Sequence, residues 1–69
     1  MRFKKDDKCF LTEKVRKHLS LPNVEYTVKD VLSDIDYPYV LNLTSEDFGK
    51  DFVQFFNDNE LLKEQETNG

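Results

Sequence analysis

Two stretches of the chain concentrate its aromatic and branched apolar residues at strand length. The first covers residues 37–44 and the second covers residues 52–56, and the polar residues 45–51 between them contain Gly49. Short apolar runs that are bounded by polar turn sequences are typical of buried strands. We therefore predict that the two stretches are the strands of a hairpin at the centre of a sheet.

Residues 24–29 alternate between apolar and polar side chains without an error. Because successive side chains of a strand point to opposite faces, this pattern predicts a half-buried strand with Val24, Tyr26 and Val28 on its inward face. Val31 lies three positions after Val28 rather than two. A bulge at the next residue or two is therefore needed to return Val31 to the core.

The segments on either side of this sheet are short. Residues 8–12 are expected to form a first strand, and Thr12 is a candidate N-cap for a single helical turn inside a long loop over residues 12–23. Near the other end of the chain, Leu61 and Leu62 are expected to close the core. We predict one all-β domain over residues 1–64, followed by a disordered polar tail over residues 65–69.

One alternative for the last apolar stretch stays open at this point. Residues 52–56 carry apolar side chains on both faces, so they are either buried on both sides or helical. The phenylalanines from Phe48 to Phe56 also fit a helical stripe behind an N-cap at Ser45. A helix near residues 46–56 would make the fold α+β.

The composition is that of an ordered globular domain. Of the 69 residues, 38% are hydrophobic and 13% are aromatic, whereas disordered chains lack aromatic residues. The charged start at residues 1–8 does not fit a signal peptide, and no apolar run approaches the roughly 20 residues of a membrane helix. Cys9 is the only cysteine, which excludes an intrachain disulfide and indicates a reducing compartment. We expect a cytoplasmic, monomeric protein with no membrane association.

The charges are sorted along the chain. Residues 1–18 carry seven basic against three acidic side chains, whereas residues 19–69 carry three basic against eleven acidic side chains. The net charge of −4 hides this asymmetry. This uneven distribution of charge affects which partners the protein attracts and how fast they associate, but it says nothing about the fold.

The order of these elements resembles a known family. The chain resembles the SH3-like small β-barrels in the order of six features. These are a basic start with a short strand, a long loop, the strand around Tyr26, the hairpin at Tyr37, a phenylalanine strand and the Glu60-Leu61 pair. The closest resemblance is to the KOW-like and mind-bomb-like variants found as free-standing small proteins of Gram-positive bacteria and their phages. The chain lacks the glycines that are usual before the first and second strands of these proteins. The resemblance implies a five-stranded SH3-like barrel over residues 4–64, a short helical turn before the last strand, and a phage or prophage accessory protein that binds peptides, RNA or DNA rather than acting as a catalyst.

Catalytic and metal-binding chemistry is not expected from this set of residues. Cys9 and His18 are the only conceivable nucleophile and base, and nothing in the sequence brings them together. The acidic residues of the turns lack the spacing and the glycine of a calcium loop. We therefore expect no enzyme activity, no cofactor and no metal.

Three binding hypotheses follow. The preferred one is a small non-enzymatic protein-interaction module, because tyrosine supplies contact area together with a polar tip. Its candidate partner-binding residues are Tyr26, Tyr37, Pro38 and Tyr39. The competing interpretation is that these residues belong to the core and the hairpin, with Tyr37 the one outside the core.

The other two hypotheses depend on charge. The basic first third would bind nucleic acid, although the overall negative charge opposes it; its candidate phosphate-contacting residues are Lys4, Lys5, Lys8, Lys14, Arg16 and Lys17. The acidic remainder would instead inhibit a DNA-binding protein or nuclease of the host by imitating DNA. The acidic residues of that hypothesis are Glu46, Asp47, Asp51, Asp58, Glu60, Glu64 and Glu66.

Overall fold

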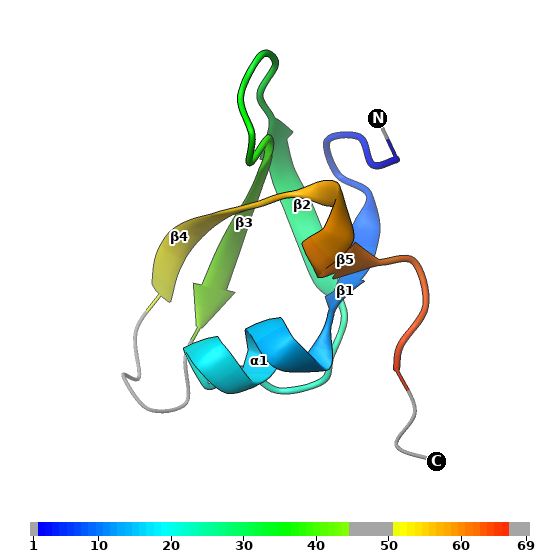
Figure 1. Ribbon diagram of the computed structural model, residues 1–69, viewed down its shortest axis with the longest axis vertical. Helices are drawn as coiled ribbons and strands as arrows, with labels where there is room; N and C mark the ends of the chain where they lie inside the picture. The colour runs from blue at the N-terminus through cyan, green and yellow to red at the C-terminus, as the bar shows by residue number, and fades with distance from the viewer. Residues whose placement is uncertain (1, 45–50, 67–69) are drawn as a thin grey trace.

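The computed structural model describes residues 2–44 and 51–66. In this part of the chain, five antiparallel strands form a single sheet with one short helix, and the strand order is β4-β3-β2-β1-β5 (Figure 1). The elements are β1 (Lys8–Leu11), α1 (Glu13–Leu19), β2 (Tyr26–Val31), β3 (Tyr39–Thr44), β4 (Asp51–Phe56), the 3-10 turn η1 (Asp58–Glu60) and β5 (Leu61–Leu62).

The central hairpin is formed by β3 and β4, as the two apolar stretches predict. Tyr39 lies opposite Phe56, and the pairing continues without a shift to the other end of both strands. Residues 51–56 are therefore a strand, and the helical alternative is wrong for them; residues 45–50 lie outside the described part of the chain. The predicted bulge in β2 is confirmed, since the register with β3 shifts between Val28 and Asp30.

One side of the sheet forms the core. Alternate residues of β3 are fully buried or nearly so, and they pack with side chains of β1, β4 and β5. Apolar side chains of this size each stabilise the fold by about 1.5–3 kcal/mol when buried. The buried cluster consists of Phe3, Cys9, Leu11, Val15, Leu21, Val28, Tyr39, Leu41, Leu43, Phe56 and Leu61.

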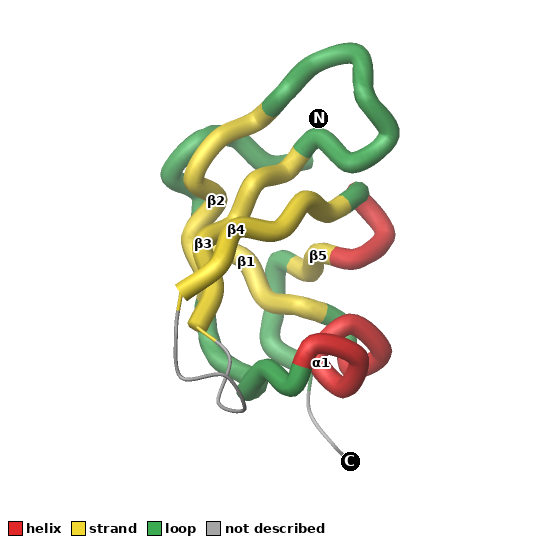
Figure 2. The backbone as a smooth tube through the Cα atoms, turned by 90° about the vertical axis from the view of Figure 1, so that its left-hand side faces the viewer, coloured by secondary structure: helices red, strands yellow, loops and turns green. Residues whose placement is uncertain are grey.

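The two edges of the sheet are β4 and β5, and in the described residues no strand pairing joins them. Figure 2 shows η1 between these two strands and α1 at one end of the sheet. The long β2–β3 loop lies at the opposite end. This arrangement leaves the β4 edge beside α1 and η1.

Helix α1 is longer than the single turn expected from the sequence, because it has seven residues, or about two turns. Thr12 is its N-cap as predicted, with the side-chain oxygen accepting a hydrogen bond from the Val15 backbone N–H at 3.4 Å. The helix ends at Ser20, which adopts a left-handed conformation, and the Leu21 N–H then donates to the Arg16 carbonyl at 2.9 Å. Both ends of α1 are thus satisfied by local hydrogen bonds.

Three smaller expectations require correction. Val24 is exposed and precedes β2, because the chain enters this strand only at Tyr26. The central strand begins at Tyr39 rather than at Tyr37, which precedes it and is half-exposed. Residues 52–56 are apolar on both faces but buried on one, since Phe56 is buried whereas Val53 and Phe55 are half-exposed.

The first residues of the predicted polar tail are held by hydrogen bonds. The Gln65 side-chain N–H donates to the Asn23 carbonyl at 2.7 Å, and the Asn23 side-chain N–H donates to the Glu66 carbonyl at 2.8 Å. Residues 67–69 lie outside the described part of the chain. Among the described helices, none is long and apolar enough to cross a membrane.

Candidate functional site

A groove of about 480 Å³ lies between α1, β4 and η1 and reaches Tyr37 at the base of the β2–β3 loop. Its size falls in the range of sites that bind peptides and small molecules. The groove combines an apolar floor with half-exposed aromatic side chains, so we take it as the candidate functional site.

The groove runs along the free edge of β4. Gln54, Phe55 and Phe56 are consecutive and all line it, although successive side chains of a strand point to opposite faces. A groove that follows the edge of the strand accounts for this lining, because an edge can be reached from both faces. The other edge of β4 pairs with β3, so the groove follows the edge whose alternate N–H and C=O groups have no strand partner among the described residues.

The floor and walls of the groove are apolar. Val15 and Phe56 are buried at its base, and Leu19 packs beside them on the core. Two half-exposed aromatic residues also line it, namely Tyr37, which is 50% exposed, and Phe55, which is 51% exposed. Half-exposed aromatic side chains beside an apolar floor are typical of sites that receive an apolar side chain of a partner.

The turn η1 forms a fixed rim. The Asn57 side-chain oxygen accepts hydrogen bonds from the backbone N–H groups of Asn59 at 3.0 Å and Glu60 at 3.1 Å. In return, the Glu60 carboxylate accepts one from the Asn57 backbone N–H at 3.0 Å. This reciprocal capping box holds the turn in one conformation.

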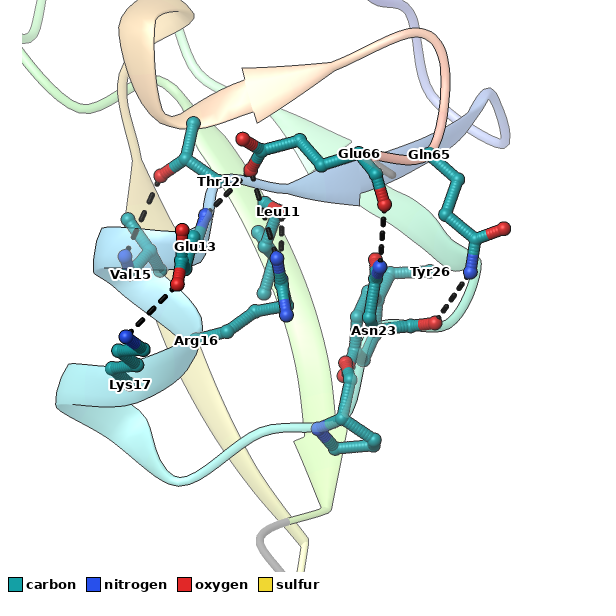
Figure 3. Close-up of polar contacts among 11 residues, drawn as sticks. Leu11, Thr12, Glu13, Val15, Arg16, Lys17, Asn23, Tyr26, Gln65 and Glu66 are labelled. Carbon is teal, nitrogen blue, oxygen red and sulfur yellow. Dashed lines mark hydrogen bonds and ion pairs between the residues drawn. The ribbon is translucent and has the colours of Figure 1, made fainter. Parts of the chain in front are cut away.

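Polar contacts hold α1 against the C-terminal segment (Figure 3). The Glu66 carboxylate accepts a hydrogen bond from the Glu13 backbone N–H at 2.6 Å and lies 3.7 Å from the Arg16 guanidinium. Arg16 Nε also donates to the Leu11 carbonyl at 3.1 Å. On the solvent side, Lys17 forms an ion pair with Glu13 at 2.9 Å, and this hydrogen-bonded cation lowers the pKa of the Glu13 carboxyl. Helix α1 is therefore fixed at its first turn.

The structure separates the four predicted partner-binding residues. Only Tyr37 lines the groove. Tyr39 is fully buried and its hydroxyl donates to the Asp58 carboxylate, and Pro38 is buried as well, so neither offers a surface to a partner. Tyr26 donates to the Pro22 carbonyl at 2.8 Å and lines a separate hollow on β2, whose other side chains are charged or polar.

The candidate phosphate-contacting residues are separated too. The lysines before and in β1 belong to the end of the sheet that carries the β2–β3 loop, whereas those of α1 belong to the other end (Figure 1). Arg16 donates a hydrogen bond to the Leu11 carbonyl and forms an ion pair with Glu66, and its side chain is only 11% exposed. Lys8 donates to the Thr27 hydroxyl at 2.7 Å. The described basic residues therefore form no single surface for a phosphate backbone.

The acidic residues of the DNA-imitating hypothesis are partly occupied within the fold. Asp58, Glu60 and Glu66 accept the internal hydrogen bonds described above. Glu46 and Asp47 lie outside the described residues. Three of the seven acidic residues of this hypothesis therefore already have hydrogen-bond partners within the fold.

The two candidate catalytic side chains, Cys9 and His18, lie in different surroundings. Cys9 is fully buried in the core, and burial, together with the smaller effects of the Glu25 and Asp7 charges, raises the pKa of its thiol to about 11. His18 is exposed on α1 and lines the groove. In residues 2–44 and 51–66, no group of three or more histidine, cysteine or acidic side chains is placed to hold a metal ion.

Sequence reasoning missed most of the groove. Phe55 was expected to be buried or on a helix because residues 52–56 are apolar on both faces, and His18 falls in the segment that was expected to be a long loop. The one available signal was the pair of faces in β4, since a strand at the edge of a small sheet cannot bury both.

Comparison of the chain with protein-family models, with curated proteins and with solved structures found no match.

Proposed function

We propose that the protein is a small non-enzymatic protein-interaction module of the SH3-like barrel type, which binds an extended segment of a partner protein along the free edge of β4. The strand order β4-β3-β2-β1-β5 and the 3-10 turn directly before β5 support the barrel assignment. The phage or prophage origin is part of the same proposal and depends on the family resemblance alone.

The observation that carries this proposal is the β4 edge beside an apolar groove. An uncovered edge strand is a template for pairing with another chain, and proteins usually protect such edges with lysine, proline or a bulge. Residues 52–56 contain neither lysine nor proline, and their pairing with β3 is regular. Val53 and Phe55 instead expose large apolar side chains there.

The binding mode would be strand addition. Main-chain hydrogen bonds from β4 to the incoming segment would supply affinity, and pockets for alternate side chains would supply specificity. An apolar side chain of the partner would enter between Tyr37 and Phe55. The fixed rim at η1 and the anchored helix α1 would keep the groove open, so that little ordering entropy is lost on binding.

The test is a selection of short random displayed peptides on the purified protein, followed by affinity measurement with labelled peptides. Phe55→Ala and Tyr37→Ala are expected to weaken binding by about tenfold or more, because half-exposed aromatic residues of a groove are typical hot spots.

The chain offers a matched control for each variant. Val53 is 46% exposed on the same face of β4 as Phe55, and Ile35 is 47% exposed in the same loop as Tyr37, but neither lines the groove. Val53→Ala and Ile35→Ala should change the affinity by less than about twofold. If the selection yields no peptide whose binding depends on Phe55 or Tyr37, the proposed function is wrong.

A further inference from the structure

The basic residues of α1 divide into two pairs. Arg16 and Lys17 are neutralised within the fold, Arg16 by Glu66 and Lys17 by Glu13. Lys14 and His18 line the groove instead, and neither has an ion pair or hydrogen bond within the part of the chain that the structure describes. Because they are four positions apart, they lie on the same face of the helix.

The carboxylate that lines the groove does not neutralise this face. Glu60 is held by η1, where its side chain accepts the hydrogen bond from the Asn57 N–H. The α1 wall of the groove thus offers unpartnered basic groups, while the β4 wall offers an aromatic ring. The two walls differ in chemistry.

The orientation of β4 determines which side chains of an added strand would face α1 and which would lie beside Phe55. Phe55 lies opposite Val40 and points away from the core face, which carries Phe56 and Tyr39. Helix α1 packs on the core face, because Val15 is part of the buried cluster. In an extended segment paired with β4, alternate side chains would therefore point toward α1 and toward the side of Phe55.

We infer that the partner segment alternates acidic and apolar residues, with its aspartates or glutamates facing Lys14 and His18 and its apolar side chains beside Phe55. This inference rests on the proposed function and narrows it to one class of ligand. Charge complementarity of this kind raises the association rate and fixes the register of a bound strand.

The selected peptides provide the first test. Clones that lose binding to Phe55→Ala are expected to be enriched in Asp and Glu at every second position, with apolar residues between them. A synthetic peptide of the consensus sequence and its isosteric version, with Asn and Gln in place of the acids, are then compared. The isosteric version should bind about tenfold more weakly at low salt, and the difference should shrink at high salt.

Two lysines of the same helix give the matched comparison. Lys14→Gln should weaken binding of the acidic consensus peptide by about three- to fivefold, the effect of one exposed ion pair. Lys17→Gln removes the same charge from a side chain outside the groove and should leave the affinity within about 1.5-fold. Lys14→Glu should reverse the preference in favour of a peptide with Lys at the acidic positions.

The possible failures are distinguishable. Peptides that depend on Phe55 but show no acidic enrichment, or that bind Lys14→Gln and wild-type protein equally, overturn the inference and leave the proposed function standing. The absence of any peptide that depends on Phe55 overturns both. A dimer in sedimentation velocity that dissociates in the Phe55→Ala variant assigns the groove to a second copy of the chain and also overturns the inference.

Discussion

Removal of the Glu66 side chain is expected to destabilise the whole fold, although this residue lies three positions from the end of the sequence. Its carboxylate is the only described side chain that accepts a hydrogen bond from the first turn of α1 and lies beside Arg16 at the same time. The Arg16 side chain is 11% exposed, so Glu66→Ala leaves a nearly buried guanidinium without its counter-charge.

The magnitude follows from the two contacts. The hydrogen bond from the Glu13 N–H involves a charged acceptor, and such bonds contribute about 1.5 kcal/mol at the low end of their range. The ion pair with Arg16 spans 3.7 Å and Glu66 is 39% exposed, so screening reduces its contribution to about 0.5 kcal/mol. The free energy of unfolding should therefore fall by about 2 kcal/mol, which in a domain of this size lowers Tm by roughly 8–16 °C.

The measurement is urea unfolding followed by circular dichroism, with Glu64→Ala as the control. Glu64 is exposed and has no contact among the described residues, so its removal should change the free energy of unfolding by less than about 0.5 kcal/mol. A double-mutant cycle of Glu66→Ala with Arg16→Gln should give a coupling of about 0.5 kcal/mol. Equal stability of the Glu66→Ala and Glu64→Ala variants would refute the reasoning.

Three further predictions concern the fold. Thr12→Ala removes the cap that accepts the Val15 N–H and should cost about 1 kcal/mol in urea unfolding, whereas Thr12→Ser should restore most of it. Burial, and to a smaller extent the hydrogen bond to Asp58, raises the pKa of the Tyr39 hydroxyl. The protonated hydroxyl therefore contributes to the free energy of unfolding below pH about 10, and this contribution is lost as the pH rises further. Tyr39→Phe should make the free energy of unfolding depend less on pH in the alkaline range, and an unchanged pH dependence would contradict this. The pKa of Cys9 is raised from 9.0 to about 11, so native protein at pH 8 should react with a thiol reagent at least about 100-fold more slowly than unfolded protein, and rapid native labelling would show that Cys9 is accessible.

Much of the sheet was predictable because its strands follow simple local rules. The alternation around Tyr26 predicted a strand there, although β2 starts two residues later than expected, and the parity slip after Val28 predicted its bulge. The apolar run predicted β3 in the same way, again with a start two residues later. Helix α1 was underestimated because its stability comes from tertiary contacts. A seven-residue helix is marginal alone, and neither the burial of Val15 nor the hydrogen bond that the Glu13 N–H donates to Glu66 can be seen in the sequence.

The candidate site was less predictable, since it depends on which strand lies at the edge. The tyrosines cluster in the sequence, but β3 begins at Tyr39 and holds it in the core, whereas Tyr37 precedes the strand and lies outside the core. The apolar character of Phe55 predicts burial, but in the sheet formed by the described residues no strand lies beyond β4. The basic residues of the first third lie apart because some belong to the segment before β1 and others to helix α1, which follows β1.

The pairing of β1 with β5 has a kinetic consequence. Phe10 lies opposite Leu62, so the first strand of the chain finds one of its neighbours only near the other end of the sequence. The chain between Phe10 and Leu62 must close into a loop before the core is complete. Folds that depend on contacts between residues so far apart in the sequence form slowly. During synthesis, the emerging chain would expose β1 and the aromatic hairpin until the final strand arrives. Truncation before Leu61 should therefore leave a species that aggregates rather than a smaller native domain.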